Sequence, residues 1–198
     1  MNVPLVVIVS GPPGAGKTTI ARELAPRLHL PLVAKDDIKE SLGDSLGSSD
    51  LAWSRKLGAA TWELLFVLYE RLLAGGASFI AESNFSRDPH HDRFAELRDR
   101  YPFVAVEVYC TASAATLAER FRGRQARGER HHVHHGAGFE AQATPEQVEE
   151  VLEGRDHVPL GLSEHVVRVD TDTSDPVDLD GIIAEIKGVR AMESTDGL

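Results

Sequence analysis

A glycine-rich segment near the start of the chain constrains the fold more than any other feature. It fits, without a mismatch, the pattern of a glycine, four residues and Gly-Lys-Thr, and it reads Ser10-Gly11-Pro12-Pro13-Gly14-Ala15-Gly16-Lys17-Thr18-Thr19. Glycines adopt backbone conformations that a Cβ forbids, so such a loop can surround a phosphate with its own N–H groups. The lysine of this pattern reaches the outer phosphates of a nucleotide, and the hydroxyl after it ligates Mg²⁺. We therefore predict a P-loop that binds ATP and Mg²⁺ through residues 11–19, with Lys17 catalytic and Thr18 a metal ligand.

The flanking residues supply the context that a P-loop requires. Before it, residues 3–9 form a short apolar, β-branched run that is typical of a buried parallel strand. After it, Ile20, Leu24 and Leu28 recur at the spacing of one helical face, and Pro26 is expected to end or kink that helix. The order strand, glycine loop, helix favours a true P-loop over a chance glycine-rich turn.

Strands and helices alternate along the rest of the chain. Apolar runs predict four further strands, at residues 30–34, 77–81, 103–110 and 165–170. Helical patterns lie between and after them, over residues 51–73, 88–100, 114–127, 144–153 and from 175 onwards. This alternation predicts an α/β fold, a P-loop NTPase with a five-stranded parallel sheet flanked by helices. We expect one domain over residues 1–190, with an arginine-rich lid at about residues 122–143 and a flexible tail over residues 191–198.

Four shorter stretches give local expectations. Residues 41–50 are rich in glycine, serine and aspartate and are expected to form a mobile connection. Residues 64–69 are apolar all round the helix and are expected to be largely buried. The histidines at positions 90–91 are expected to be exposed. Trp53 and Trp62 are interpreted as core or pocket-wall residues rather than as a stacking device.

The composition limits the class of partner and the compartment. The chain of 198 residues carries a formal net charge of −10, which disfavours long polyanions such as nucleic acids and favours a small substrate. It has no apolar run long enough to span a membrane, and its start lacks a cleavable signal pattern. The single cysteine, Cys110, excludes an internal disulfide and is typical of a reducing cytoplasm. Its place at the end of an apolar strand suggests a small buried hydrophobe.

Two neighbouring carboxylates follow the predicted second strand. Asp36 and Asp37 come directly after residues 30–34, and ligands of parallel sheets bind outside the carboxyl ends of the strands. Either residue can also cap the helix that begins near Ile38. We expect at least one of the two to act in the chemistry of the site.

Glu82 and Asn84 follow the predicted third strand. A carboxylate at this position beside a P-loop can hold a Mg²⁺-bound water, or it can be a solvated strand end. Asn84 can orient a substrate or start a turn. Both functions stay open at this level.

Arginines are concentrated at the end of the helix at 114–127 and just beyond it. The five are Arg120, Arg122, Arg124, Arg127 and Arg130. So many guanidiniums in eleven positions repel one another unless anions neutralise them, and guanidinium suits phosphate because its planar fork binds two oxygens. A solvated basic helix end that complements the helix dipole is the alternative. Since the chain has a P-loop, we expect at least one of them to reach the nucleotide.

A histidine-rich stretch, His131-His132-Val133-His134-His135, comes next. Without a cysteine nearby, and with glycines and arginines on either side, it does not favour a structural zinc site. A substrate-facing lid segment is the preferred interpretation, and its internal position disfavours an expression tag.

Taken together, these motifs resemble the P-loop kinases related to chloramphenicol phosphotransferase, zeta toxins and the kinase domain of phage polynucleotide kinase, within the wider nucleoside-monophosphate and gluconate kinase group. The resemblance rests on the P-loop, Lys35-Asp36-Asp37, Glu82-Ser83-Asn84-Phe85, the arginines from Arg120 to Arg130, and Val169-Asp170-Thr171. These motifs span most of the chain in the order of the family. Two features depart from it: Glu82 stands where several relatives carry aspartate, and the histidine stretch is denser than in relatives.

The resemblance implies roles for individual residues. It makes Asp36 the general base on a substrate hydroxyl. Among the lid arginines, which contact the transferred phosphate in relatives, Arg127 is the first choice, followed by Arg124 and Arg130. It also implies nucleotide contacts from Arg120, Arg124, Asp170, Thr171 and Thr173. The predicted substrate-binding residues are Asp36, Lys39, Asn84, Arg130, His132 and His135.

We therefore expect an ATP-dependent phosphotransferase that moves the γ-phosphate to a hydroxyl of a small molecule such as an antibiotic, a nucleoside or a sugar. A polynucleotide 5′-hydroxyl or a nucleotide-sugar is the alternative acceptor. A regulatory P-loop ATPase or binding module without an acceptor is the alternative class. The lack of an Asn-Lys-x-Asp signature, and of an apolar run ending in Asp-Glu, disfavours a GTPase or a motor ATPase.

Overall fold

One parallel sheet organises the protein. The computed structural model describes residues 3–134, 144–153, 158–172 and 176–195. The five strands of the sheet pair in the order β2-β3-β1-β4-β5, and all the pairs are parallel. Their bounds are β1 Leu5–Ser10, β2 Leu32–Ala34, β3 Phe79–Glu82, β4 Val104–Thr111 and β5 Val166–Asp170. The predicted α/β fold with a five-stranded parallel sheet is confirmed.

Helices follow or connect the strands as the alternation predicts. Those that the structure describes are α1 Lys17–Leu28, α2 Lys35–Leu46, α3 Leu51–Ala74, α4 Arg87–Arg100, α5 Ala114–Ala126, α7 Pro145–Glu153 and α8 Leu179–Thr195. The start of α7 is a capping box, since Thr144 and Gln147 exchange hydrogen bonds between side chain and backbone N–H. Pro26 lies in the last turn of α1, which ends two residues later.

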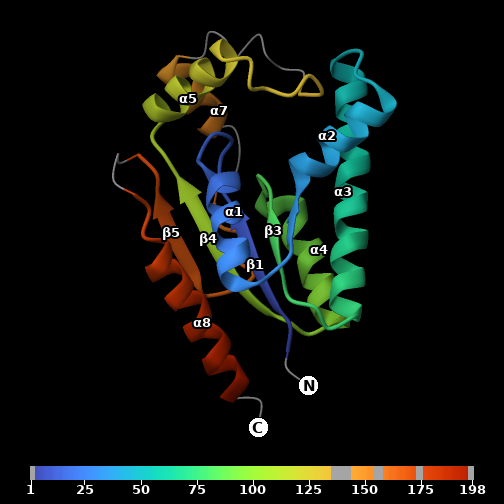
Figure 1. Ribbon diagram of the computed structural model, residues 1–198, viewed down its shortest axis with the longest axis vertical. Helices are drawn as coiled ribbons and strands as arrows, with labels where there is room; N and C mark the ends of the chain where they lie inside the picture. The colour runs from blue at the N-terminus through green and yellow to red at the C-terminus, as the bar shows by residue number, and fades with distance from the viewer. Residues whose placement is uncertain (1–2, 135–143, 154–157, 173–175, 196–198) are drawn as a thin grey trace.

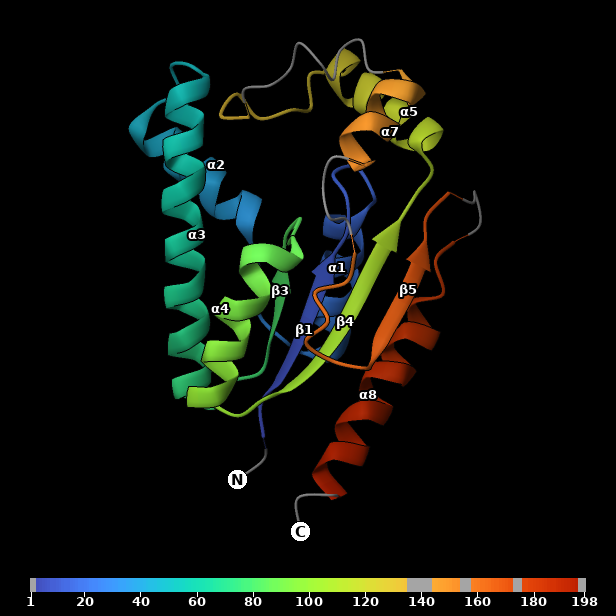
Figure 2. The same cartoon turned by 180° about the vertical axis from the view of Figure 1, so that it is seen from behind.

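Alternate side chains of the central strand enter two separate cores. β1 is buried along its whole length. Val7 packs with α1 and α8 on one face of the sheet, whereas Val6 and Ile8 pack with α3 and α4 on the other. Figures 1 and 2 show these two helix layers in front of and behind the sheet. A continuous apolar run therefore forms a strand with no solvated face.

The carboxyl ends of the strands open on one edge of the sheet. Above that edge lie α5 and α7 on one side, and α2 with the first half of α3 on the other (Figure 1). The chain goes from β1 to one side of the sheet for β2 and β3, then to the other side for β4 and β5. Such a reversal next to the first strand is where parallel sheets bind ligands.

The connection predicted over residues 41–50 is mostly helical. α2 runs on to Leu46 in spite of its serines, aspartate and Gly43. Gly43 allows the helix to approach Val133, whose side chain lies 2.6 Å from where a Cβ on Gly43 would stand. Tertiary packing therefore overrides the weak helix propensity of these residues.

Burial on α3 and α4 also differs from expectation. Leu64, Val67 and Leu68 are 42%, 50% and 43% exposed, so the stretch 64–69 is buried on one face only. His90 is buried, because its ring lies 4.0 Å from that of Trp62. Trp62 is half-buried and packs against the core between the sheet and α3 and α4, as predicted, but the expectation of an exposed His90 is wrong.

The end of the chain is more ordered than predicted. α8 continues to Thr195, so residues 191–195 extend a helix where a flexible tail was expected. Alanine, methionine and glutamate at these positions are good helix formers. Within the described residues, none of the helices is both long and apolar enough to cross a membrane.

Candidate active site

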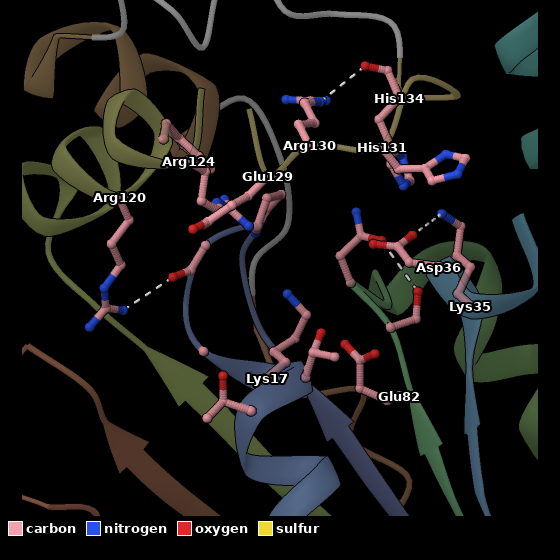
Figure 3. A pocket seen from close by; sticks show the side chains of 18 of the residues that line it. Lys17, Lys35, Asp36, Glu82, Arg120, Arg124, Glu129, Arg130, His131 and His134 are labelled. Atoms are coloured by element: carbon pink, nitrogen blue, oxygen red, sulfur yellow. Dashed lines mark hydrogen bonds and ion pairs between the residues drawn. The ribbon is translucent and has the colours of Figure 1, made fainter. Parts of the chain in front are cut away.

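A cavity of about 750 Å³ lies at the carboxyl edge of the sheet. Side chains from five parts of the chain enclose it: the P-loop with the first turn of α1, the start of α2, the segment after β3, α5 with the loop that follows, and the segment after β5 (Figure 3). Among its lining residues are Lys17, Thr18, Lys35, Asp36, Glu40, Glu82, Asn84, Arg120, Arg124, Arg127, Arg130, His134 and Thr171.

The P-loop has the backbone of a phosphate cradle. Gly11, Gly14 and Gly16 have φ values of 137°, 85° and 77°. A Cβ on Gly11 would stand 2.1 Å from the Cys110 carbonyl oxygen, and one on Gly14 would stand 3.0 Å from the Phe121 ring. Only glycine fits this path, which curves over the first turn of α1, where N–H groups without helical partners favour anions. The loop therefore fits the phosphates of a nucleotide.

Lys17 is held within this cradle. Its ammonium donates a hydrogen bond to the Pro12 carbonyl oxygen over 2.8 Å, and the residue is buried. Burial lowers the pKa of Lys17, while the negative charge of Glu82 opposes that shift. Pro13, Gly14, Gly16, Thr18 and Thr19 line the cavity, whereas Gly11, Pro12 and Ala15 shape the loop behind it.

Glu82 is a buried carboxylate at the end of β3. It is 3% exposed, which rules out the solvated strand end that the sequence left open. Burial raises the pKa of Glu82 to about 7, although Lys17 and a hydrogen bond from Thr18 act in the opposite direction. A hydroxyl and a carboxylate in contact beside a phosphate cradle are the oxygen donors that Mg²⁺ prefers, so Thr18 and Glu82 fit a magnesium site. Asn84 lines the cavity next to them and accepts a hydrogen bond from Ser83.

Glu82 gives the stability of the protein a defined pH dependence. The pKa in the fold lies above the unfolded value near 4.5, so the folded state binds more protons between about pH 4.5 and 7. Glu82 therefore favours folding below pH 4.5 and progressively loses this contribution as the pH rises to 7. Relative to Glu82→Gln, we expect the wild-type free energy of unfolding to fall by about 3 kcal/mol over this range. Urea denaturation of both proteins at several pH values measures this; parallel pH profiles would contradict it.

The two aspartates after β2 face different surroundings. The N-cap of α2 is Ala34 and no side chain caps this helix, so neither Asp36 nor Asp37 has the capping role that the sequence left open. Asp36 lines the cavity, 3.5 Å from the ammonium of Lys35, whereas Asp37 pairs with Arg22 outside it. Burial raises the pKa of Asp36, but the charges of Lys35, His134 and Lys17 outweigh it, and the net pKa is lowered. Asp36 is therefore an ionised acceptor facing the cavity.

Three of the arginines on α5 and just after it, Arg120, Arg124 and Arg127, make different contacts, whereas residues 135–143 of the predicted lid lie outside the described residues. Arg120 ties the P-loop to the end of β5, since it donates to the Gly14 carbonyl oxygen over 3.1 Å and to the Thr171 hydroxyl over 2.9 Å. Arg124 lines the cavity, and burial lowers its pKa. Arg127, the first choice from the sequence, lines the rim but forms a bidentate pair with Glu129. Arg127 is already neutralised by Glu129, so Arg124 (labelled in Figure 3) is the better placed of the two for a phosphate.

The contacts of Arg120 predict a structural role. Replacing Arg120 with methionine leaves the Gly14 and Thr171 groups without their donor, so we expect a loss of about 1–3 kcal/mol in the free energy of unfolding. Arg127→Met is the matched control, because its pair with Glu129 is exposed, and it should unfold like the wild type. Denaturant titration of both variants measures the difference; equal stabilities would contradict the assigned role of Arg120.

The segment after β5 closes the nucleotide side of the cavity. Thr171 is buried and lines the cavity, while Asp170 accepts a hydrogen bond from the Asp172 N–H. Asp172 in turn accepts bonds from the N–H and hydroxyl of Ser113, which fixes the segment to the end of β4. Thr173 lies outside the described residues.

The predicted substrate residues are only partly brought together. Lys39 does not line the cavity, and its ammonium donates a hydrogen bond of 2.9 Å to the Ser54 hydroxyl. That hydroxyl in turn donates to the Val133 carbonyl oxygen. His132 also lies outside the cavity lining, and His135 is outside the described residues. Arg130 does line the cavity and donates to the His134 carbonyl oxygen.

The sequence analysis gave no individual role to Lys35, Glu40 and His134, which all line the cavity. Lys35 precedes Asp36 and points into the cavity, with its ammonium 5.4 Å from the centre of the Trp62 ring. Glu40 lies one helical turn after Asp36, a spacing that could have indicated it. His134 pairs with Glu40 over 3.0 Å, a contact across ninety-four positions that no sequence pattern shows.

The sheet, the P-loop and the cavity at the carboxyl edge define the general class of P-loop kinase domains. A family model described as an AAA domain matches residues 6–147. The chain therefore belongs to this family.

Full-length likeness comes from solved structures. A candidate kinase from Chloroflexus aurantiacus is 35% identical, with a TM-score of 0.81 over 98% of both chains. An APS kinase from Mycobacterium tuberculosis, solved with AMPPNP and APS, is 16% identical with a TM-score of 0.55 over 96% of this chain and 98% of that one. The second likeness shows the fold alone.

Curated relatives match over short segments. A cytidylate kinase from Pyrobaculum islandicum is 46% identical over 43 residues, which are 22% of this chain and 23% of that protein. A 2-phosphoglycerate kinase from Pyrococcus horikoshii is 38% identical over 71 residues, which are 31% of this chain and 24% of that protein. The chain thus matches about a quarter of the length of these relatives.

Proposed function

We propose that this protein is an ATP-dependent phosphotransferase whose acceptor is a hydroxyl of a small molecule. One observation carries the proposal: Asp36, an ionised carboxylate, projects into the same cavity as Lys17 and the P-loop (Figure 3). A base on this side of a phosphate cradle can hydrogen-bond an acceptor hydroxyl and take its proton as the bond to phosphorus forms. A regulatory ATPase without an acceptor needs no such group.

Each part of the site has a task in this reaction. The P-loop N–H groups and Lys17 hold the phosphates, and Arg124 offsets charge on the oxygens of the transferring group. Thr18 and Glu82 would hold Mg²⁺, which neutralises phosphate charge when bound. Asp36 orients and deprotonates the acceptor. Catalysis is then mainly positioning and electrostatic stabilisation.

The acceptor half of the cavity mixes both signs of charge. Lys35, Arg130 and His134 lie on the same side as Asp36 and Glu40. Such a wall suits a polar, hydroxyl-bearing metabolite, and the net charge of −10 disfavours a polynucleotide. The resemblance to chloramphenicol phosphotransferases supports an antibiotic as one acceptor to test. The names of the relatives, a cytidylate kinase and a 2-phosphoglycerate kinase, do not choose between acceptors.

Two further expectations belong to this proposal. A cytoplasmic location is expected, because a chain with a single cysteine, here the buried free thiol of Cys110, suits a reducing compartment. ATP rather than another nucleotide is expected from the resemblance.

The test is a screen for acceptor-dependent ADP release. Pools of antibiotics, nucleosides, sugars, hydroxy acids, nucleoside monophosphates and a short 5′-hydroxyl oligonucleotide are each offered with ATP and Mg²⁺. We expect one hydroxyl-bearing pool to raise ADP release above the background. A response to nucleoside monophosphates alone would show that the acceptor group is a phosphate rather than a hydroxyl. Background ADP release in every pool would favour a regulatory ATPase.

A further inference from the structure

A second group of polar side chains borders the acceptor half of the cavity, and one of its members, His131, also lines that cavity. Asp44 comes from α2, and His131 and His132 come from the segment after α5, eighty-seven positions away. His131 Nε2 is 3.1 Å from Asp44 Oδ1, and His132 Nε2 is 3.9 Å from the same oxygen. One ligand atom from each residue lies within 4.8 Å of the other two.

This group has the donors and spacing of a transition-metal site. Two imidazoles and one carboxylate are a ligand set that Zn²⁺ uses when a fourth position stays open to water or another molecule. Tetrahedral zinc with bonds of about 2.0–2.2 Å places its ligand atoms about 3.4 Å apart. Asp44 Oδ1 lies 3.1 and 3.9 Å from the two imidazole nitrogens, so small shifts would suffice to bind an ion. The group is unlike the magnesium site, where the donors are oxygens. The lack of a nearby cysteine argues against a closed structural site but not against an open one.

The backbone around the histidines is already fixed by packing. The side chain of Val133, the next residue in the loop, is fully buried against Gly43 of α2. The carbonyl oxygen of Val133 accepts a hydrogen bond from Ser54 over 2.7 Å, and that of His132 accepts one from Ser48 over 3.2 Å. Ligands on a fixed backbone lose less conformational entropy when they bind an ion.

We propose that Asp44, His131 and His132 bind a Zn²⁺-type transition-metal ion that ties the loop after α5 to α2. Binding at Nε2 places the ring proton of His131 on Nδ1. The ring then gives up the bond of 3.3 Å that it accepts from the Val133 N–H. This bond is long, so its loss is a small cost beside two or three metal–ligand bonds.

The site would control the acceptor half of the cavity. The loop that it fixes carries Arg130 and His134 into the cavity, and Glu40 lies one turn before Asp44 on α2. A bound ion would hold these groups around the acceptor, lowering its KM while leaving ATP binding unchanged. This consequence rests on the proposed function, whereas the metal site itself does not.

The experiment measures metal binding without nucleotide or acceptor. Tag-free protein is stripped with a chelator, then titrated with Zn²⁺ by calorimetry and with Co²⁺ by visible absorption, which reports tetrahedral coordination. We expect one ion per chain, and at least about a tenfold loss of affinity in both Asp44→Asn and His132→Ala. His91→Ala is the matched control, because His91 pairs with Asp92 over 3.0 Å elsewhere on the surface; it should bind like the wild type.

The outcomes separate this proposal from the proposed function. No stoichiometric binding by the wild type would overturn the site. Undiminished affinity in Asp44→Asn would also overturn it, since the histidines alone would then hold the ion. A protein that binds the ion but transfers no phosphate would contradict the proposed function and leave the metal site standing.

Discussion

Replacing Asp36 with asparagine is expected to lower kcat by about 10²–10⁴-fold with little change in ATP affinity. The amide keeps the size and polarity of the carboxylate but cannot accept the proton of the acceptor hydroxyl. ATP binding should persist, because the phosphates are held by the P-loop and Lys17. Steady-state kinetics with the acceptor from the screen, together with calorimetric titration of an ATP analogue, measures both quantities.

Asp37→Asn is the matched control for this variant. It removes the same charge from the next residue, but Asp37 pairs with Arg22 at an exposed position and does not line the cavity. We expect its kcat to stay near that of the wild type. Equal losses in the two variants would indicate a general effect of charge near α2, and full activity of Asp36→Asn would end its assignment as the base.

Replacing Gly11 with alanine is expected to destabilise the protein by about 3 kcal/mol or more and to abolish nucleotide binding. The new Cβ would stand 2.1 Å from the Cys110 carbonyl oxygen, at a φ of 137°. Cys110 lies in β4, which pairs with β1 over residues 104–109 and with β5 at Cys110 itself, so the contact cannot be relieved by moving a side chain. Thermal unfolding and nucleotide titration measure the two effects.

Gly76→Ala separates the clash from backbone strain. Gly76 also has a positive φ, 70°, but no atom lies within 4 Å of its added Cβ. We expect only the cost of the left-handed conformation, about 1–2 kcal/mol, and unchanged nucleotide binding. If the two variants were equally stable, the close approach of the P-loop to β4 would not be what requires glycine.

Local patterns were enough for the sheet and for the nucleotide half of the site. Continuous apolar runs predicted the strands, and the spacing of the glycines, Lys17 and Thr18 predicted the P-loop. Both features depend only on residues that are near one another in the sequence. The carboxyl ends of parallel strands meet at one edge, which is why Asp36, Glu82 and Thr171 could be expected in one place.

The acceptor half depends on contacts between distant segments, and there the sequence was a weaker guide. The direction of Lys39 is decided by Ser54 on α3, and the burial of His90 by Trp62. Nothing in the histidine stretch indicates that Asp44 or Glu40 would face it. Side-chain direction and pairing across eighty or more positions follow from packing, which periodicity does not encode.

The central claim is that Asp36 and the P-loop act together to move a phosphoryl group from ATP to a hydroxyl. The most direct measurement follows label from γ-labelled ATP into the acceptor, identified by mass spectrometry, with the wild type and Asp36→Asn side by side. We expect labelled phosphate on a hydroxyl oxygen of the acceptor with the wild type and almost none with Asp36→Asn. Label recovered only as inorganic phosphate, at equal rates in both proteins, would contradict the account.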